Sequence, residues 1–339
     1  MKPAMVFTGV LAAALASAVP VAFAAGSPPG PNGSGARVGA WLSHMADQAR
    51  GENYEGTFVY MEGGHLETFR VIHRVTGHTT EARMYALNGE HREVHRVDGK
   101  VNCFWPDAGE MLKSSTGASN PFPNPFPANP AKLAPYYRFR MFGTARVADH
   151  ECRRVGLIPR DGYRYGYRMC LQPGTGMLLE SRLMNARGKV LQQVLYTRIS
   201  YPRHIDSGLL KPKVDTHALK RIPPARAQPQ LDAGGGGWKA SRLPPGFRLV
   251  SRHYEFTQGR STPVQHIVYT DGLATVSLFV GPVPPSGAVF NGVSREGSIN
   301  AFGTVRQGHQ VTVVGSVPMQ TLRMIGTSVQ SVPAGGGKR

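Results

Sequence analysis

The sequence lacks the short motifs that mark many enzyme active sites. It contains no G-x-S-x-G turn, phosphate-binding loop or Cys-x-x-Cys pair, and no closely spaced pair of acids stands out. His91 and His95 stand four residues apart, but Gly89 and Gly99 bound a segment with the pattern of a strand. On a strand these histidines would lie about 13 Å apart, too far to share a metal. We therefore expect a protein that is not an enzyme, with no catalytic residues, no cofactor and no metal.

Acidic residues are also scarce. The chain has 21 Asp and Glu against 39 Lys and Arg, which gives a formal net charge of +18. Such a balance indicates attraction to something anionic. Nucleic acid, anionic lipid and acidic protein segments all fit this charge.

The N-terminus has the pattern of an export signal. Lys2 precedes an apolar run over residues 5–19, and Ala22-Phe23-Ala24 forms an A-x-A cleavage site. We interpret residues 1–24 as a cleaved signal peptide, because the run is short for a membrane anchor and no stop-transfer flank follows. Export makes nucleic acid an unsuitable partner and permits disulfides.

Hydrophobic periodicity divides the exported chain into two folded parts. After a disordered leader at 25–36, the spacing of apolar residues predicts an amphipathic helix over 37–50. From residue 54 to 201 the period becomes two, which predicts nine or ten short antiparallel strands that form a strongly curved sheet over the helix. Residues 106–130 interrupt them, and the part rich in Pro and Phe at 121–130 is predicted to be an extended surface loop.

A basic, Pro/Gly-rich linker is predicted at 202–237, before a second folded part at 238–330 and a disordered tail at 331–339. The second part shows further strands, a hairpin turn at Asp271-Gly272 and a terminal helix that opens at Pro318. The predicted fold class is therefore α+β with mostly antiparallel strands.

The cysteines suggest one disulfide. If Arg160, Asp161 and Gly162 form a three-residue loop, Cys152 lies directly opposite Cys170 on the neighbouring strand. We predict that these two are bonded and that Cys103 is free. The alternative is a pair of buried free thiols, because a direct cross-strand disulfide is strained.

The same register separates two faces of this hairpin. One is apolar and aromatic and carries Val155, Leu157, Tyr163, Tyr165, Tyr167 and Met169. The other carries Arg154, Arg164 and Arg168, which suit a phosphate or carboxylate partner. We expect the basic linker to assist them through Lys211, Lys213, Lys220 and Arg221. The alternative is an ordinary solvated surface of a basic protein.

Several stretches together resemble the RseB/MucB family of periplasmic sigma-E regulatory proteins. In the first part they are Trp41-Leu42, Asn53–Tyr60, Leu87–Val94 and Asp161–Arg168. In the second part they are Leu243–Phe247, His266–Ala274 and Val311–Pro318. The resemblance runs in the same order from about residue 37 to residue 329.

The resemblance implies a two-domain binding protein of the periplasm. Its larger domain would be an unclosed, curved β-barrel similar to the LolA/LolB lipoprotein carriers, with covering helices, and its smaller domain an α+β module. The protein would bind the periplasmic part of an RseA/MucA-like anti-sigma factor and shield it from site-1 proteolysis. Lipid or lipopolysaccharide would release it. The run at 121–130 and the four glycines at 234–237 depart from the family pattern.

Three alternatives stay open at this point. A periplasmic lipid or lipoprotein carrier could use the same curved sheet, and a hydrolase could bring its catalytic groups together only in the folded chain. A homo-oligomer fits the sequence as well as a monomer does. Phe58, Tyr60, Phe69 and Trp105 are the candidates for an apolar cavity that takes acyl chains. They could equally fill a close-packed core.

Overall fold

The computed structural model describes residues 31–114, 130–222, 237–255, 262–284, 287 and 289–332. The predicted signal peptide, most of the leader, the run at 121–129 and the tail after 332 lie outside the described residues. None of the helices in the described ranges is long and apolar enough to cross a membrane.

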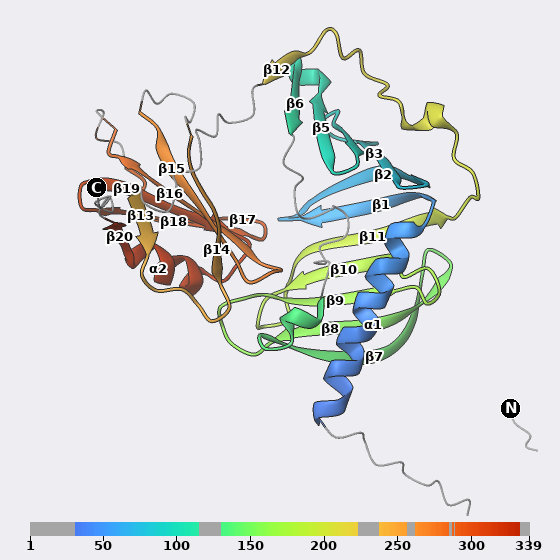
Figure 1. Cartoon of the computed structure of the whole chain (residues 1–339), viewed down its shortest axis with the longest axis horizontal. Helices are drawn as coiled ribbons and strands as arrows, with labels where there is room; N and C mark the ends of the chain where they lie inside the picture. The colour runs from blue at the N-terminus through green and yellow to red at the C-terminus, as the bar shows by residue number, and fades with distance from the viewer. Residues whose placement is uncertain are drawn as a thin grey trace, which may run out of the picture.

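Helix α1 (Pro31–Gly51) packs on the large sheet of the first domain (Figure 1). It begins at Pro31, so the last residues of the predicted leader are helical; proline suits the first turn because its missing N–H has no partner there anyway. Val38, Leu42 and Met45 are buried at the predicted helical spacing. They pack against Leu133 of the short helix η2 (Pro130–Leu133) and against the strands β7 (Tyr137–Val147), β8 (His150–Pro159) and β9 (Gly166–Leu171).

The large sheet has twelve strands in the order β12-β6-β5-β4-β3-β2-β1-β11-β10-β9-β8-β7. Their bounds are β1 Tyr54–Glu62, β2 His65–Thr76, β3 Thr79–Ala86, β4 Glu93–Val97, β5 Lys100–Trp105, β6 Glu110–Ser114, β7 Tyr137–Val147, β8 His150–Pro159, β9 Gly166–Leu171, β10 Leu178–Met184, β11 Val190–Ser200 and β12 Lys220–Ile222. All neighbours are antiparallel except β12 and β6. Because β12 and β7 are not paired with each other, the sheet is unclosed, and the predicted fold class is confirmed.

The stretch predicted to be a linker is partly folded onto the first domain. Ile205 and Leu210 are buried against Ile72 of β2, and Leu210 is the last residue of the helical turn η3 (Ser207–Leu210). Further along, β12 extends the sheet beside β6. Only residues 223–236, between β12 and β13, lie outside the described residues.

The second domain has a six-stranded sheet in the order β14-β15-β16-β19-β18-β17 and a separate β13–β20 pair. The bounds are β13 Gly237–Ala240, β14 Arg248–Glu255, β15 Val264–Thr270, β16 Thr275–Pro282, β17 Gly292–Glu296, β18 Ile299–Arg306, β19 His309–Gly315 and β20 Val329–Val332. Helix α2 (Met319–Thr327) buries Leu322 and Ile325 against one face of the larger sheet. The predicted hairpin at Asp271-Gly272 joins β15 to β16.

Candidate functional site

An apolar pocket of about 280 Å³ lies on strands β1 to β5 of the first domain. Its walls include Phe69, Met84, Phe104 and Trp105. The volume is at the lower end of the range for small-molecule sites, about 300–1,000 Å³. A hydrophobic wall of this kind suits an alkyl chain.

Polar groups lie among the pocket walls. Arg92 forms an ion pair with Glu67 and holds its guanidinium carbon 5.5 Å from the centre of the Phe69 ring. Burial raises the pKa of the Tyr60 hydroxyl, and its hydrogen bond to Glu62 raises it further. The pocket therefore offers an apolar wall, while its charged lining consists of Arg92, the carboxylate of Glu67 that pairs with it, and Glu93.

Three of the four residues predicted for an acyl cavity contribute to this pocket. Tyr60, Phe69 and Trp105 line it. Phe58 does not, because it is fully buried between Phe69 and Tyr196, with its ring centre 5.4–5.5 Å from theirs. The free cysteine, Cys103, also lines the pocket, and burial raises the pKa of its thiol.

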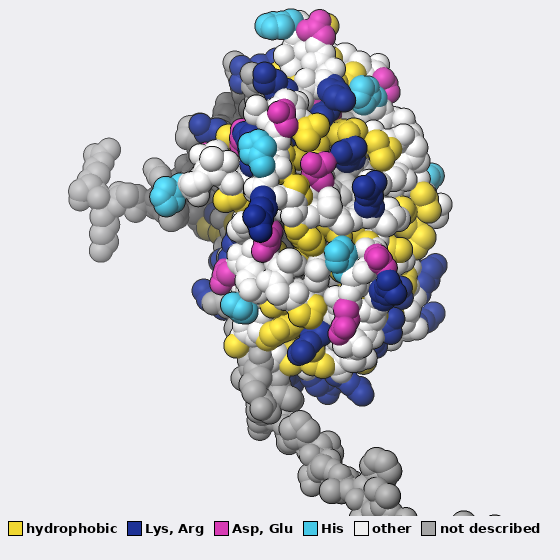
Figure 2. Space-filling view, turned by 90° about the vertical axis from the view of Figure 1, so that its right-hand side faces the viewer, with side chains coloured by type: hydrophobic (Ala, Val, Ile, Leu, Met, Phe, Trp, Pro, Cys, Tyr) yellow, Lys and Arg dark blue, Asp and Glu magenta, His cyan; other side chains and the backbone are white. Residues whose placement is uncertain are grey.

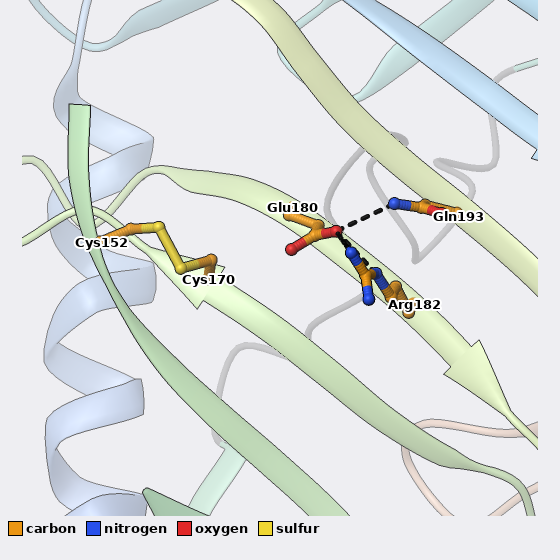
Figure 3. Close-up of a disulfide and its surroundings, with 5 residues drawn as sticks. All are labelled: Cys152, Cys170, Glu180, Arg182 and Gln193. Carbon is orange, nitrogen blue, oxygen red and sulfur yellow. Dashed lines mark hydrogen bonds and ion pairs between the residues drawn. A yellow bond between two sulfur atoms is a disulfide. The ribbon is translucent and has the colours of Figure 1, made fainter. Parts of the chain in front are cut away.

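Cys152 and Cys170 form a disulfide that joins β8 to β9 (Figure 3), as predicted from the sequence. The register used for that prediction is wrong, since Cys170 pairs with Arg154 rather than with Cys152. The connection runs over Arg160–Tyr165 instead of only Arg160–Gly162, because Asp161 caps a wider loop by accepting from the Tyr163 amide. The cysteine Cα atoms nevertheless lie 5.3 Å apart, within the usual range for a disulfide.

The predicted basic face exists, but Arg164 is not part of it. Arg154 and Arg168 are exposed on the side of the sheet away from α1, and the register adds Arg140 and Arg182 to them. We call Arg140, Arg154, Arg168 and Arg182 the arginine face. Figure 2 shows one side of the molecule, on which Lys and Arg side chains gather along the lower right margin.

Two further groups shape the arginine face. The Phe142 ring lies on Gly156, where any Cβ would meet it at 2.6 Å, and the Arg168 guanidinium carbon stacks 3.6 Å from the ring centre. Glu180 is the acid on this surface; it accepts from Arg182 at 2.6 Å and from Gln193 at 2.9 Å (Figure 3). Positive charge is thus in excess around a hollow of about 190 Å³.

Lys211 and Lys213 do not join this face. Both are exposed, and the backbone N–H of Lys213 donates to Glu93 of β4. In the sheet, β4 and β9 are separated by β3, β2, β1, β11 and β10. The prediction of one basic patch that includes these lysines is therefore wrong for the folded chain.

Arg164 is also absent from the arginine face, which corrects its predicted role as an exposed anion ligand. Its side chain is fully buried between the two domains, where it donates to Asp271 at 2.8 Å and to Asp161 at 3.1 Å. A third bond reaches the carbonyl of Pro245 at 2.6 Å. In the wider loop the Arg164 side chain points inward. This burial is stable because its donors are paired, as a buried guanidinium requires.

Aromatic rings from both domains enclose the Arg164 guanidinium. Its carbon lies 4.9 Å from the ring centre of Tyr136 and 5.5 Å from that of Phe247. Gly246 has a positive φ of 83°, and a Cβ there would collide with the Tyr136 ring. The contact of the domains at Arg164, which we call the domain joint, thus depends on glycine at this position.

Hydrogen bonds extend the domain joint in both directions. Thr321 donates to the carbonyl of Tyr163 at 2.6 Å, and Asn300 donates to the hydroxyl of Tyr165 at 2.8 Å. Farther away, the amide of Ser298 donates to Glu62 at 2.9 Å. Three of the stretches that carry the family resemblance therefore meet here: Asp161–Arg168, Leu243–Phe247 and His266–Ala274.

A second buried arginine fastens the folded part of the linker. Arg83 is bidentate to Glu93, at 2.7 Å and 3.1 Å, and its remaining donor reaches the carbonyl of Leu209 at 3.2 Å. His95 contacts the same carboxylate. This histidine therefore belongs to a buried charge cluster, and it does not face His91.

Comparison with known proteins shows which family the two domains belong to. The model of the MucB/RseB N-terminal domain matches residues 37–214, and that of the MucB/RseB C-terminal domain matches residues 232–330. This chain belongs to the MucB/RseB family. Among its curated MucB/RseB relatives is the sigma factor AlgU regulatory protein MucB of Pseudomonas aeruginosa, which is 29% identical over 296 residues, or 86% of this chain and 90% of the relative.

A second curated relative is the sigma-E factor regulatory protein RseB of Escherichia coli, 25% identical over 293 residues, or 86% of this chain and 90% of the relative. Among solved structures, the complex of Pseudomonas aeruginosa MucA and MucB superposes with a TM-score of 0.71 at 27% identity, covering 88% of this chain and all of the MucB/RseB chain compared. A crystal structure described as MucB superposes with a TM-score of 0.62 at 28% identity, covering 88% of this chain and 99% of that chain.

Proposed function

We propose that this protein is a periplasmic negative regulator of a sigma-E envelope-stress response. It would bind the periplasmic part of a membrane-bound anti-sigma factor and shield that factor from site-1 proteolysis. The observation that carries the proposal is the full-length likeness to MucB as solved in complex with MucA. Both domains take part in that likeness, as a regulator that uses the two together requires.

The domain joint supports the same proposal. A partner that contacts two domains needs them in a fixed relation, or it loses free energy in ordering them. Arg164, Asp271 and Pro245 supply that relation through buried, charge-assisted bonds. The joint would thus preorganise the surface that receives the anti-sigma factor.

Calorimetric titration tests the proposal. The exported chain would be titrated with the periplasmic segment of the anti-sigma factor from the same bacterium. We expect saturable binding at micromolar concentrations or below. A scrambled segment of equal length and charge is the control, and equal heats for the two segments would contradict the proposal.

The ligand that releases the regulator would be a lipid or lipopolysaccharide held by the apolar pocket. The walls formed by Phe69, Met84, Phe104 and Trp105 suit an acyl chain. We expect Val94→Trp to fill the pocket and weaken a fluorescent acyl probe at least tenfold. Val97 is exposed on the same strand, so Val97→Trp is the matched control. Equal affinity of the two variants for the probe would show that this pocket does not bind the acyl chain.

The arginine face would add attraction for an anionic partner, either lipid A phosphates or an acidic stretch of the anti-sigma factor. Exposed charges act mainly on the association rate and are screened beyond about 8 Å at physiological salt. Changing Arg140, Arg154 and Arg168 to Gln should slow association and flatten its salt dependence. Arg153, Arg187 and Arg198 are exposed outside this face, and their change to Gln gives a control of equal charge.

A lipid carrier is the second candidate function, and the apolar pocket is the observation that favours it. A carrier moves lipid between membranes without an anti-sigma factor. Transfer of a labelled lipid from donor to acceptor vesicles, catalysed by the purified chain, would support the carrier. Binding of the anti-sigma segment without such transfer would support the regulator.

A further inference from the structure

The second domain brings two histidines and a carboxylate together on neighbouring strands. His253 of β14 pairs directly with His266 of β15, and Glu255 lies two residues beyond His253 on the same face. One donor atom of each residue lies within 4.8 Å of a donor atom of the other two. Ile267 and Tyr269 face the core under α2, so the three polar side chains lie on the opposite face.

The distances match those of a tetrahedral metal site. One oxygen of Glu255 lies 3.4 Å from Nε2 of His253 and 3.3 Å from Nδ1 of His266. Metal bonds of about 2.0–2.1 Å in a tetrahedron place donor atoms about 3.3 Å apart. Two of the three edges therefore already have the required length, and the third, between the histidine nitrogens, is no longer than 4.8 Å.

The surroundings prepare His266 to act as a ligand. Its Nε2 lies 3.0 Å from the hydroxyl of Ser277, so Nε2 can donate its proton there and leave Nδ1 free to bind. The Phe279 ring stacks on the imidazole, with the ring centres 4.3 Å apart, and restrains its rotation.

We propose that His253, Glu255 and His266 bind one divalent transition-metal ion, with Zn²⁺ the ion that fits best. Two imidazoles and a carboxylate with a fourth position open to water are a common zinc donor set. All three side chains are about one-fifth exposed or less, so the ion would be partly shielded yet reachable from solvent. A bound ion would cross-brace β14, the edge strand of its sheet, to β15.

Cobalt substitution tests the site, because tetrahedral Co²⁺ absorbs strongly in the visible range. The tag-free exported chain would carry Cys103→Ser, so that its only free thiol contributes no signal. We expect one Co²⁺ per chain, displaced by one Zn²⁺, with a micromolar or lower Kd for Zn²⁺. His253→Gln and His266→Gln should each weaken binding at least tenfold. His78 lies exposed in a turn of the first domain, so His78→Gln should change nothing.

Ser277→Ala supplies a variant that keeps all three ligands. Loss of the hydrogen bond to His266 should weaken Zn²⁺ several-fold, as outer partners of metal ligands commonly do. Far-UV circular dichroism without metal checks that each variant is folded. No Zn²⁺ binding below 1 mM, or equal binding by the parent chain and both histidine variants, would overturn the proposal.

Discussion

Arg83 and Arg164 make similar contacts in two different places. Each is almost completely buried, with 1% and 3% of its surface exposed, and each is paired with a carboxylate and a backbone carbonyl. Arg83 and its partner Glu93 lie on neighbouring strands of one domain. Arg164 and its partner Asp271 lie in different domains.

This difference decides what each ion pair can control. A buried charge without its partner is costly because it has lost its hydration. Arg83 can regain water only if β3 and β4 separate or the segment around Leu209 leaves the sheet, and either event disrupts the first domain. Arg164 can regain water if the two domains part while each stays folded. The first pair should therefore govern stability, and the second should govern the placement of the domains.

Glu93→Gln should give the largest effect. It leaves Arg83 buried without a carboxylate, and removing one partner of a buried pair costs about 3–5 kcal/mol. Urea unfolding followed by far-UV circular dichroism measures this loss. Glu67→Gln is the control, since Glu67 pairs with Arg92 where both side chains are about one-third exposed. An exposed pair contributes about 1 kcal/mol or less.

The pH dependence of stability separates the charge of Glu93 from its shape. Burial alone would raise the pKa of the Glu93 carboxyl, but hydrogen bonds from His95 and Arg83 outweigh it and lower the pKa to about 2. The folded chain thus binds this proton more weakly than the unfolded chain does. The contribution is complete above about pH 4.5 and is lost as the pH falls toward 2. Glu93→Gln should remove this part of the slope, and an unchanged slope would contradict the assignment.

The disulfide is a covalent cross-link within the first domain. Its contribution to the free energy of unfolding can be compared with that of the Arg83–Glu93 ion pair. Cys152→Ser with Cys170→Ser should cost about 3 kcal/mol on the chain-entropy model. Reduction of the parent chain should reproduce that loss in urea unfolding. Cys103→Ser is the control and should change little, because this residue is free and half-buried. A cost equal to that of the control would contradict a stabilising role.

Asp271→Asn should have the smallest effect on stability and a distinct effect on shape. The domains can separate and let water reach Arg164. The free energy of unfolding of the first domain should therefore fall by less than about 1 kcal/mol. The radius of gyration from small-angle X-ray scattering should rise, and affinity for the anti-sigma segment should fall. Asp215→Asn, at an exposed position before β12, is the control. A large loss of stability without a change in the radius of gyration would show that the Arg164 pair governs stability and not the placement of the domains.

Local patterns predicted most of the fold, because apolar periodicity and turn residues act over a few positions. The buried side of α1 and the Asp271-Gly272 hairpin are examples. The predicted register between Cys152 and Cys170 was wrong because it depended on loop length. Asp161 widens the loop by accepting from the nearby Tyr163 amide, and Arg164 bonds to Asp271 in a distant part of the chain. Pairing of the cysteines survived this error because the bonded Cα atoms need only approximate proximity.

The functional residues were harder to predict because several act across domains or strands. Nothing local distinguishes Arg164 from the exposed Arg154 and Arg168, since burial follows from Asp271, more than one hundred residues away. The only available signal was the run Asp161–Arg168. It resembles the family sequence more fully than an exposed surface loop would need to. His253 and His266 likewise meet only through the pairing of β14 with β15.

Shielding of the anti-sigma factor can be measured from the rate at which its site-1 protease cleaves it. The full-length factor would be placed in vesicles with its periplasmic side accessible and exposed to the protease, with and without saturating amounts of the exported chain. We expect the chain to slow cleavage at least tenfold, and Asp271→Asn to protect the factor less well at equal concentration. Cleavage at an unchanged rate, with the chain demonstrably bound to the factor, would contradict the proposed shielding.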